Sequence, residues 1–236
     1  MQDLLDQLRD RLNKTFGDRL VSVILYGSAA SSDYSGSHSD LNILCVLTQV
    51  TIRELSDSEP IFHWWRKKGN PSPLLLSEEE VAGSTDCFAI EFHDMRERRK
   101  VLAGKDVIEG LAIDQSFYRA RVEHELRSKL LRLRQKAAGV MQDGDLLCRL
   151  LADSVSTFLV LFRHALLLAG HPAPMAKAEI VQEAARNFGV DARTFQQVLD
   201  LREEKLKPKS INAGELLERC LKQIEMVIRT VDALEK

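Results

Sequence analysis

Two apolar segments flank a serine-rich stretch between residues 20 and 47, and this pattern constrains the fold more than any other part of the chain. The first segment, LVSVILYGS, consists mostly of Val, Ile and Leu and ends at Gly27 and Ser28. The second, DLNILCVL, begins at Asp40. Short apolar runs bounded by turn residues are typical of buried strands. The polar stretch of about a dozen residues between them is too long for an ordinary hairpin, so we expect a loop with room for a short helical turn.

The residue types at the ends of these segments suit phosphate and metal binding. Backbone N–H groups of a Gly-Ser turn can approach an anion closely, and Ser28 adds a hydroxyl. Asp40 and Asn42 stand two positions apart on the expected second strand, so their side chains share a face. Mg²⁺ prefers oxygen ligands, often with substrate phosphates completing its shell. The pattern therefore indicates a site for Mg²⁺ and a phosphate-bearing ligand.

The rest of the first half predicts helices and strands in mixed order. Leucines at helical spacing predict a helix over residues 2–16, and residues 51–70 predict a second helix that breaks at Gly69. The segment PLLLSEEEVAGS predicts a short strand and then a helix with a capping box formed by Ser77 and Glu80. A mixed sheet with flanking helices accounts for these elements.

Residues 87–95, CFAIEFHDM, alternate apolar with more polar residues, which predicts another strand. Glu91 lies on its less apolar face. If this strand lies beside the one that opens the magnesium motif, Glu91 joins the same group of oxygen ligands. Because a register slip of one residue exchanges the two faces, Asp86 and Asp94 stay open as alternatives for this acid.

From about Asp114 the pattern becomes helical and stays so. We therefore expect an α+β domain over residues 1–112, with a mixed sheet and flanking helices, followed by an all-α antiparallel helical bundle over residues 113–236. The apolar residues of these helices fit either a homodimer interface or the core of a monomer. The expected helices lie near residues 114–138, 144–170, 175–188, 192–205 and 212–235.

Composition excludes several classes of protein. No apolar run in the 236 residues approaches the length needed to span a bilayer, and the N-terminus lacks a secretory pattern, so we expect a cytoplasmic protein with no membrane partner. A formal net charge of −2 gives no reason to expect a nucleic-acid partner. The basic clusters at 96–100 and 127–136 are interpreted as solvated helix faces. The four scattered cysteines are interpreted mostly as reduced core residues.

The stretch LYGSAASSDYSGSHSDLNILCVL resembles the signature of the DNA polymerase beta nucleotidyltransferase superfamily. That signature is an apolar strand, Gly-Ser, an interval of about the same length, and then Asp-apolar-acid-apolar. Within the superfamily the chain is most similar to the small bacterial nucleotidyltransferases related to the aminoglycoside-modifying enzymes. Those proteins have a small catalytic domain followed by a helical domain.

The resemblance implies roles for individual residues. Gly27 and Ser28 would contact a nucleoside triphosphate, with ATP as the expected donor. Asp40 would bind the Mg²⁺ cofactor, and Glu91 is the best candidate for the third acid, which assists deprotonation of the acceptor hydroxyl. The acceptor would be a small molecule or a protein.

Two departures from the signature leave two functions open. Asn42 replaces the second acid of the motif, and the loop after Ser28 lacks the arginine that many relatives carry. A carboxamide oxygen can bind a metal but brings no charge to offset the repulsion between two divalent ions. The protein is therefore expected to be either a magnesium-dependent nucleotidyltransferase or a catalytically impaired member of the fold that binds a nucleotide or a partner.

Overall fold

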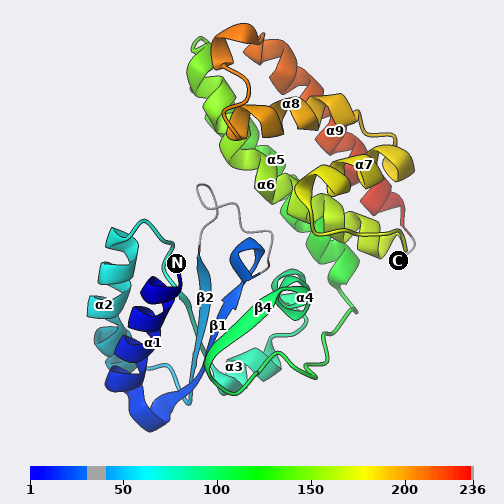
Figure 1. The fold of residues 1–236 in the computed structure, drawn as a ribbon. Helices are drawn as coiled ribbons and strands as arrows, with labels where there is room; N and C mark the ends of the chain where they lie inside the picture. Colours follow the sequence, from blue (N-terminus) through cyan, green and yellow to red (C-terminus); the bar gives the residue numbers. More distant parts are fainter. Residues whose placement is uncertain (31–40, 235–236) are drawn as a thin grey trace. The chain divides into compact units, whose positions relative to one another are not determined.

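The computed structural model describes residues 1–30 and 41–234, which form two compact units, Met1–Gln115 and Ser116–Lys236 (Figure 1). The first unit combines a mixed sheet with flanking helices. The regular structure in the described part of the second unit is helical throughout. The predicted fold class, an α+β domain followed by an all-α bundle, is confirmed.

The sheet of the first unit contains, among the described residues, four strands in the order β3-β2-β1-β4. The central strand β1 (Leu20–Tyr26) pairs antiparallel with β2 (Asn42–Leu47) on one side and with β4 (Arg99–Gly104) on the other. The edge strand β3 (Leu74–Ser77) pairs parallel with β2. The two strands predicted between residues 20 and 47 are confirmed, and they lie side by side within the sheet.

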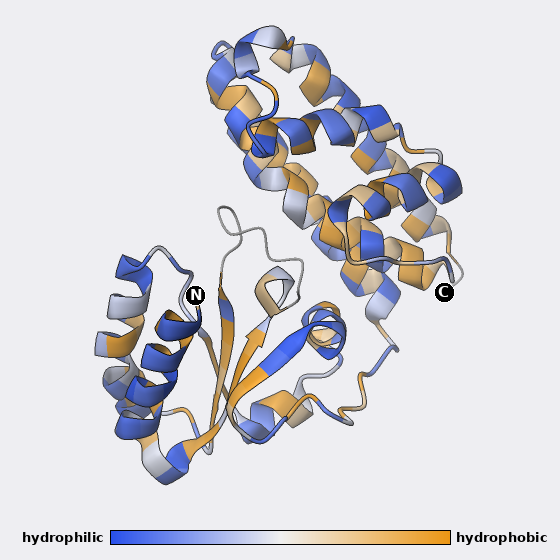
Figure 2. Cartoon of the chain, viewed as in Figure 1, coloured by the Kyte–Doolittle hydropathy of each residue, from blue (hydrophilic) through white to orange (hydrophobic). Residues whose placement is uncertain are grey.

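Each face of the sheet carries its own hydrophobic core, because side chains alternate along a strand. Val23 and Leu25 of β1 pack with α1 and α2, whereas Ile24 packs with α3 and α4. Figure 1 shows the two helix pairs on opposite sides of the sheet, and Figure 2 shows the apolar strands between them. The capping box predicted at Ser77 and Glu80 is confirmed. These helices are α1 (Gln2–Phe16), α2 (Ile52–Lys67), α3 (Glu78–Gly83) and α4 (Ala89–Glu97).

The strand expected over residues 87–95 is wrong, because most of these residues belong to helix α4. Three buried side chains of α4, Ala89, Phe92 and Met95, recur at every third position, which fits one face of a helix. In the same segment Phe88, Ile90 and Phe92 fit a period of two, so over so short a stretch periodicity alone could not decide. The strand that pairs with β1 is β4, which follows α4 and opens with charged residues, Arg99 and Lys100.

The second unit is built around α6, which contacts the other four long helices of the unit. All five helices expected from the sequence are confirmed to within about one turn at each end, the usual precision of helix boundaries. The helices are α5 (Tyr118–Ala138), α6 (Gly144–Leu168), α7 (Lys177–Phe188), α8 (Ala192–Arg202) and α9 (Ala213–Ala233).

Two expectations from composition can be compared with the structure. In residues 1–30 and 41–234 no helix combines the length and the apolar character that crossing a membrane requires. All four cysteines lack a disulfide. Cys45, Cys148 and Cys220 are buried, as expected of core residues, whereas Cys87 is exposed just before α4.

Candidate active site

Strand β1 ends in a tight turn at Gly27 and Ser28, where the short 3₁₀ helix η2 (Ser28–Ala30) begins. Gly27 has a φ of 79°, a left-handed conformation that favours glycine. Its N–H donates to the carbonyl oxygen of Arg98 at 3.1 Å, and its carbonyl accepts from the N–H of Ala30 at 3.0 Å. The turn is therefore fixed to the start of β4, and Ser28 is exposed.

Asn42, the first residue of β2, lies against this turn. A Cβ atom on Gly27 would lie 3.4 Å from Nδ2 of Asn42. In the sheet register Asn42 is opposite Tyr26, and Tyr26 is opposite Arg99. Directly opposed residues of antiparallel strands share a face, and Tyr26 packs into the core that contains Phe92 of α4. Asn42, Tyr26 and Arg99 thus form a row on the α4 face, beside the Gly-Ser turn; we call it the cross-strand row.

Glu91 lies in the first turn of α4, directly before the buried Phe92, and its side chain is exposed. The pKa of Tyr26 is raised to about 12, first by burial of its side chain and second by the negative charge of Glu91. Glu91 therefore lies within electrostatic reach of the cross-strand row. The predicted strand is wrong, but Glu91 on α4 still lies close enough to Tyr26 for its charge to act on that side chain.

The described residues include part of the predicted metal set. Asp40 lies outside them, whereas Asn42 and Glu91 offer a carboxamide and a carboxylate oxygen at this end of the sheet. These oxygen donors fit Mg²⁺ in kind. Within residues 1–30 and 41–234, no three His, Cys, Asp or Glu side chains gather closely enough to hold a metal ion.

The two alternatives to Glu91 have other positions. Asp86 precedes α4, and its Oδ1 accepts a hydrogen bond from the N–H of Cys87 at 2.8 Å. Asp94 is half-buried one turn further along α4 than Glu91. Of the three carboxylates, Glu91 is the one whose charge raises the pKa of Tyr26. This electrostatic contact distinguishes Glu91 from the two alternatives, and its role as the third acid stays a prediction.

Sequence reasoning missed two members of the row, Tyr26 and Arg99. Arg99 belongs to the basic cluster that was interpreted as a solvated face, but its Nε donates to both carboxylate oxygens of Asp106, at 2.8 and 3.0 Å. Burial alone would raise the pKa of Asp106, but hydrogen bonds from Arg99 and from backbone N–H groups outweigh it and lower that pKa. The register of β4 against β1 places Arg99 opposite Tyr26. The sequence could reveal this only if β4 were first identified as the strand that pairs with β1.

The helical unit holds a separate pair of cations. The pKa of Lys177 is lowered, first by burial and second by the positive charge of Arg202, with Glu203 acting in the opposite direction. Arg202 donates to the carbonyl oxygen of Ala152 in α6 at 3.0 Å.

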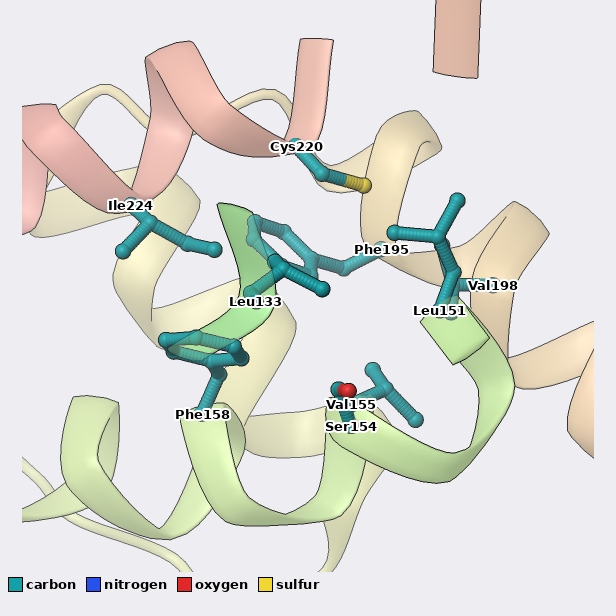
Figure 3. Close-up of a pocket in the computed structure, with 9 residues that line it drawn as sticks. All are labelled: Leu133, Leu151, Ser154, Val155, Phe158, Phe195, Val198, Cys220 and Ile224. Atoms are coloured by element: carbon teal, nitrogen blue, oxygen red, sulfur yellow. The ribbon is translucent and has the colours of Figure 1, made fainter. Parts of the chain in front are cut away.

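The helical unit also contains a small internal cavity, shown in Figure 3. Its volume is about 10 Å³, the size of a single water molecule. The one hydroxyl on its lining, Ser154 Oγ, already donates to the carbonyl oxygen of Leu150 at 2.7 Å. This cavity is a packing defect rather than a ligand site. It is lined by Leu133, Leu151, Ser154, Val155, Phe158, Phe195, Val198, Cys220 and Ile224.

The described part of the chain combines a mixed sheet, whose central strand ends in a Gly-Ser turn, with a helical unit that follows it. The solved structure of spectinomycin adenyltransferase AAD(9) from Enterococcus faecialis with ATP and spectinomycin has this fold. It superposes with a TM-score of 0.63 over 98% of this chain and 99% of that chain, at 13% sequence identity. No protein-family model and no curated protein sequence matches the chain. The predicted resemblance is thus confirmed at the level of the fold.

Proposed function

We propose that this protein is a magnesium-dependent nucleotidyltransferase that moves a nucleoside monophosphate from a nucleoside triphosphate, ATP first, to a hydroxyl of a small molecule or protein. The observation that carries the proposal is that Asn42 lies against the Gly-Ser turn and Glu91 acts on the neighbouring Tyr26, in a chain that shares the fold of an adenyltransferase over nearly its whole length. Residues 1–112 would form the catalytic domain and residues 113–236 the bundle domain. A cytoplasmic location and a homodimer stay predictions.

The proposed chemistry assigns one task to each part of the site. Gly27 and Ser28 would contact the phosphates, with the exposed Ser28 as the donor because the N–H of Gly27 already donates to the carbonyl oxygen of Arg98. Asp40, Asn42 and Glu91 would hold Mg²⁺. When bound, the ion supplies positive charge that stabilises the phosphate oxygens. Positioning and electrostatic stabilisation account for most of the catalysis in such transfers.

The transfer itself is an in-line substitution at the α-phosphorus. The acceptor oxygen attacks that atom, the bond to the β-phosphate oxygen breaks, and pyrophosphate leaves. Glu91 accepts the proton of the acceptor hydroxyl. Its exposure allows it to reach a substrate.

The first test is calorimetric titration of the protein with ATP and the other nucleoside triphosphates, with and without magnesium. We expect magnesium-dependent binding that weakens about tenfold or more in Asp40→Ala, because a charged metal ligand is lost. Asp18→Ala is the matched control, since Asp18 is an exposed carboxylate in the 3₁₀ helix η1 (Gly17–Arg19), which precedes β1. Absence of binding to every nucleoside triphosphate would contradict the proposal.

One observation favours a second function, that of an impaired enzyme kept for binding a nucleotide or a partner. Asn42 packs its uncharged carboxamide against Gly27, so this position brings no negative charge to the phosphate-binding turn. The variant Asn42→Asp separates the two functions. An enzyme short of one charge should gain turnover, measured as pyrophosphate release, whereas a binding module should show none before or after the substitution.

A further inference from the structure

An open groove of about 520 Å³ lies between the end of α4, the start of β4 and residues 108–113. Its volume falls in the range of small-molecule sites. The steps assigned above to the Gly-Ser turn, to Asn42 and to Glu91 do not use it. The side chains that line it combine charge with apolar surface, and they include Arg96, Arg99, Glu109, Ile108, Leu111 and Ile113.

Both arginines of the groove are held in place by backbone carbonyl groups. Nη2 of Arg96 donates to the carbonyl oxygen of Leu111 at 2.8 Å. Nη1 of Arg99 donates to the carbonyl oxygen of Arg96 at 2.7 Å. A guanidinium that is already oriented loses less conformational entropy when it binds a ligand than one that moves freely. The groove therefore presents preorganised donors.

The charges on the groove are not equivalent. Asp106 neutralises Arg99 in an ion pair of 2.8 Å. Arg96 forms no ion pair with any residue in the described part of the chain, and neither does Glu109, although both line the same groove. The guanidinium of Arg96 keeps donors that suit a carboxylate or a phosphate. Glu109 carries the opposite charge and would repel such a group.

The groove adjoins the cross-strand row through Arg99, which belongs to both. Arg99 is opposite Tyr26, and Tyr26 is opposite Asn42. Neighbouring strands lie about 4.8 Å apart, so the backbones at Arg99 and Asn42 are separated by about 10 Å. A small molecule in the groove can therefore extend a hydroxyl to the row.

We propose that this groove binds the acceptor, and that the acceptor is a small molecule with a hydroxyl, an apolar body and an anionic group that contacts Arg96. The apolar body would lie on Leu111 and Ile113, which are partly exposed, whereas Ile108 is buried beneath the groove. This inference rests on the proposed function, because it assigns the groove to the same reaction. It adds the class of acceptor, which the Gly-Ser turn and the metal ligands do not specify.

The test measures binding without nucleotide, by saturation-transfer NMR and competition. The probes are para-hydroxymethylbenzoate and para-hydroxymethylphenyl phosphate, which distinguish a carboxylate from a phosphate, and para-hydroxymethylbenzylamine as the cationic counterpart. We expect at least one of the two anionic probes to bind more tightly than the amine.

Arg96→Gln should weaken the binding of the anionic probes about tenfold, because a charge-assisted hydrogen bond is lost. Glu109→Gln should strengthen it, because a repulsive charge is removed.

Arg66→Gln, which removes an exposed arginine of α2, should leave binding of the anionic probes unchanged. Preferential binding of the amine, equal binding of the anionic probes to wild type and Arg96→Gln, or no binding of either anionic probe to wild type would overturn the proposal. If magnesium and ATP bind while the anionic probes do not, the groove assignment fails and the proposed function stands. If the probes bind and no nucleoside triphosphate does, the acceptor role falls together with the proposed function.

Discussion

At the scale of single residues, glycine occupies two strand ends where φ is positive. Gly27 adjoins the side chain of Asn42, and Gly104, the last residue of β4, adjoins β1. A Cβ atom on Gly104 would lie 2.0 Å from the carbonyl oxygen of Val21, and its φ of 73° is left-handed. Neither the contact nor the conformation tolerates a side chain.

Gly104→Ala should therefore destabilise the first unit by about 3 kcal/mol or more, because strain and backbone overlap add together. The matched control is Gly69→Ala, since Gly69 has a φ of 85° but a Cβ atom there would meet no atom within 4 Å. That variant should lose about 1 kcal/mol from strain alone. Urea unfolding of the three proteins measures the difference, and equal losses in the two variants would contradict the role of the contact with Val21.

Thiol reactivity gives a second prediction at this scale. Burial raises the pKa of Cys45 and of Cys220 to about 12 and raises that of Cys148 as well, whereas Cys87 is exposed. Because the thiolate is the reactive form, we expect a disulfide reagent near neutral pH to modify Cys87 rapidly and the other three slowly. Cys87→Ser should abolish the fast phase, and unfolding in denaturant should release all four thiols.

Single residues also show where sequence reasoning succeeds. Gly27, Ser28 and Asn42 could be identified because their turn and strand are local patterns. Tyr26 and Arg99 could not, because their place in the site depends on which strand pairs with β1. Pairing between segments far apart in the chain is not encoded in a local period.

At the scale of elements, α4 shows why a short amphipathic segment misleads. Different subsets of the apolar residues at 88–95 fit a period of two and a helical period, and the outcome depends on packing against Ile24 and Leu44 of the sheet. Helix α2 shows the opposite case, because a capping box marks its start. The side chain of Thr51 accepts from the N–H of Arg53, and Glu54 accepts from the N–H of Thr51 at 3.1 Å. Local chemistry at a helix end is thus more informative than a short periodicity.

The cap of α2 leads to a prediction about acid stability. Hydrogen bonds to Glu54, first from the side chain of Thr51 and then from Arg19, lower its pKa from 4.5 to about 2. Since the folded pKa is the lower one, the stabilisation is present above pH 4.5 and is lost as the pH falls towards 2. Glu54→Gln should therefore lower stability at neutral pH, and its difference from wild type should shrink on acidification.

Urea midpoints between neutral pH and the acid limit measure this effect. Glu59→Gln is the control, because Glu59 is an exposed glutamate on the same helix. It should change stability little at any pH. A constant difference between wild type and Glu54→Gln across the range would show that the ionised carboxylate is not what stabilises the start of α2.

At the scale of the whole molecule, each unit buries a core of its own. In the first unit two apolar clusters cover the two faces of the sheet, and in the second the helices pack around α6. The change from mixed to purely helical patterns was visible in the sequence, because long amphipathic helices have a strong period. The groove beside α4 was not, since it is formed by residues whose positions depend on the strand β4.

Separate cores predict separate folding. We expect the fragments Met1–Gln115 and Ser116–Lys236 each to fold alone, because hydrophobic burial within each unit supplies most of its stability. Circular dichroism should show a cooperative thermal transition for both, with a mainly helical spectrum for the second. A fragment that begins at Leu131, in the middle of α5, is the control, since it loses the buried residues Val122, Leu126 and Leu130. If that truncated fragment melts as cooperatively as Ser116–Lys236, or if Ser116–Lys236 shows no transition, the helical unit does not fold as the self-contained body that its core implies.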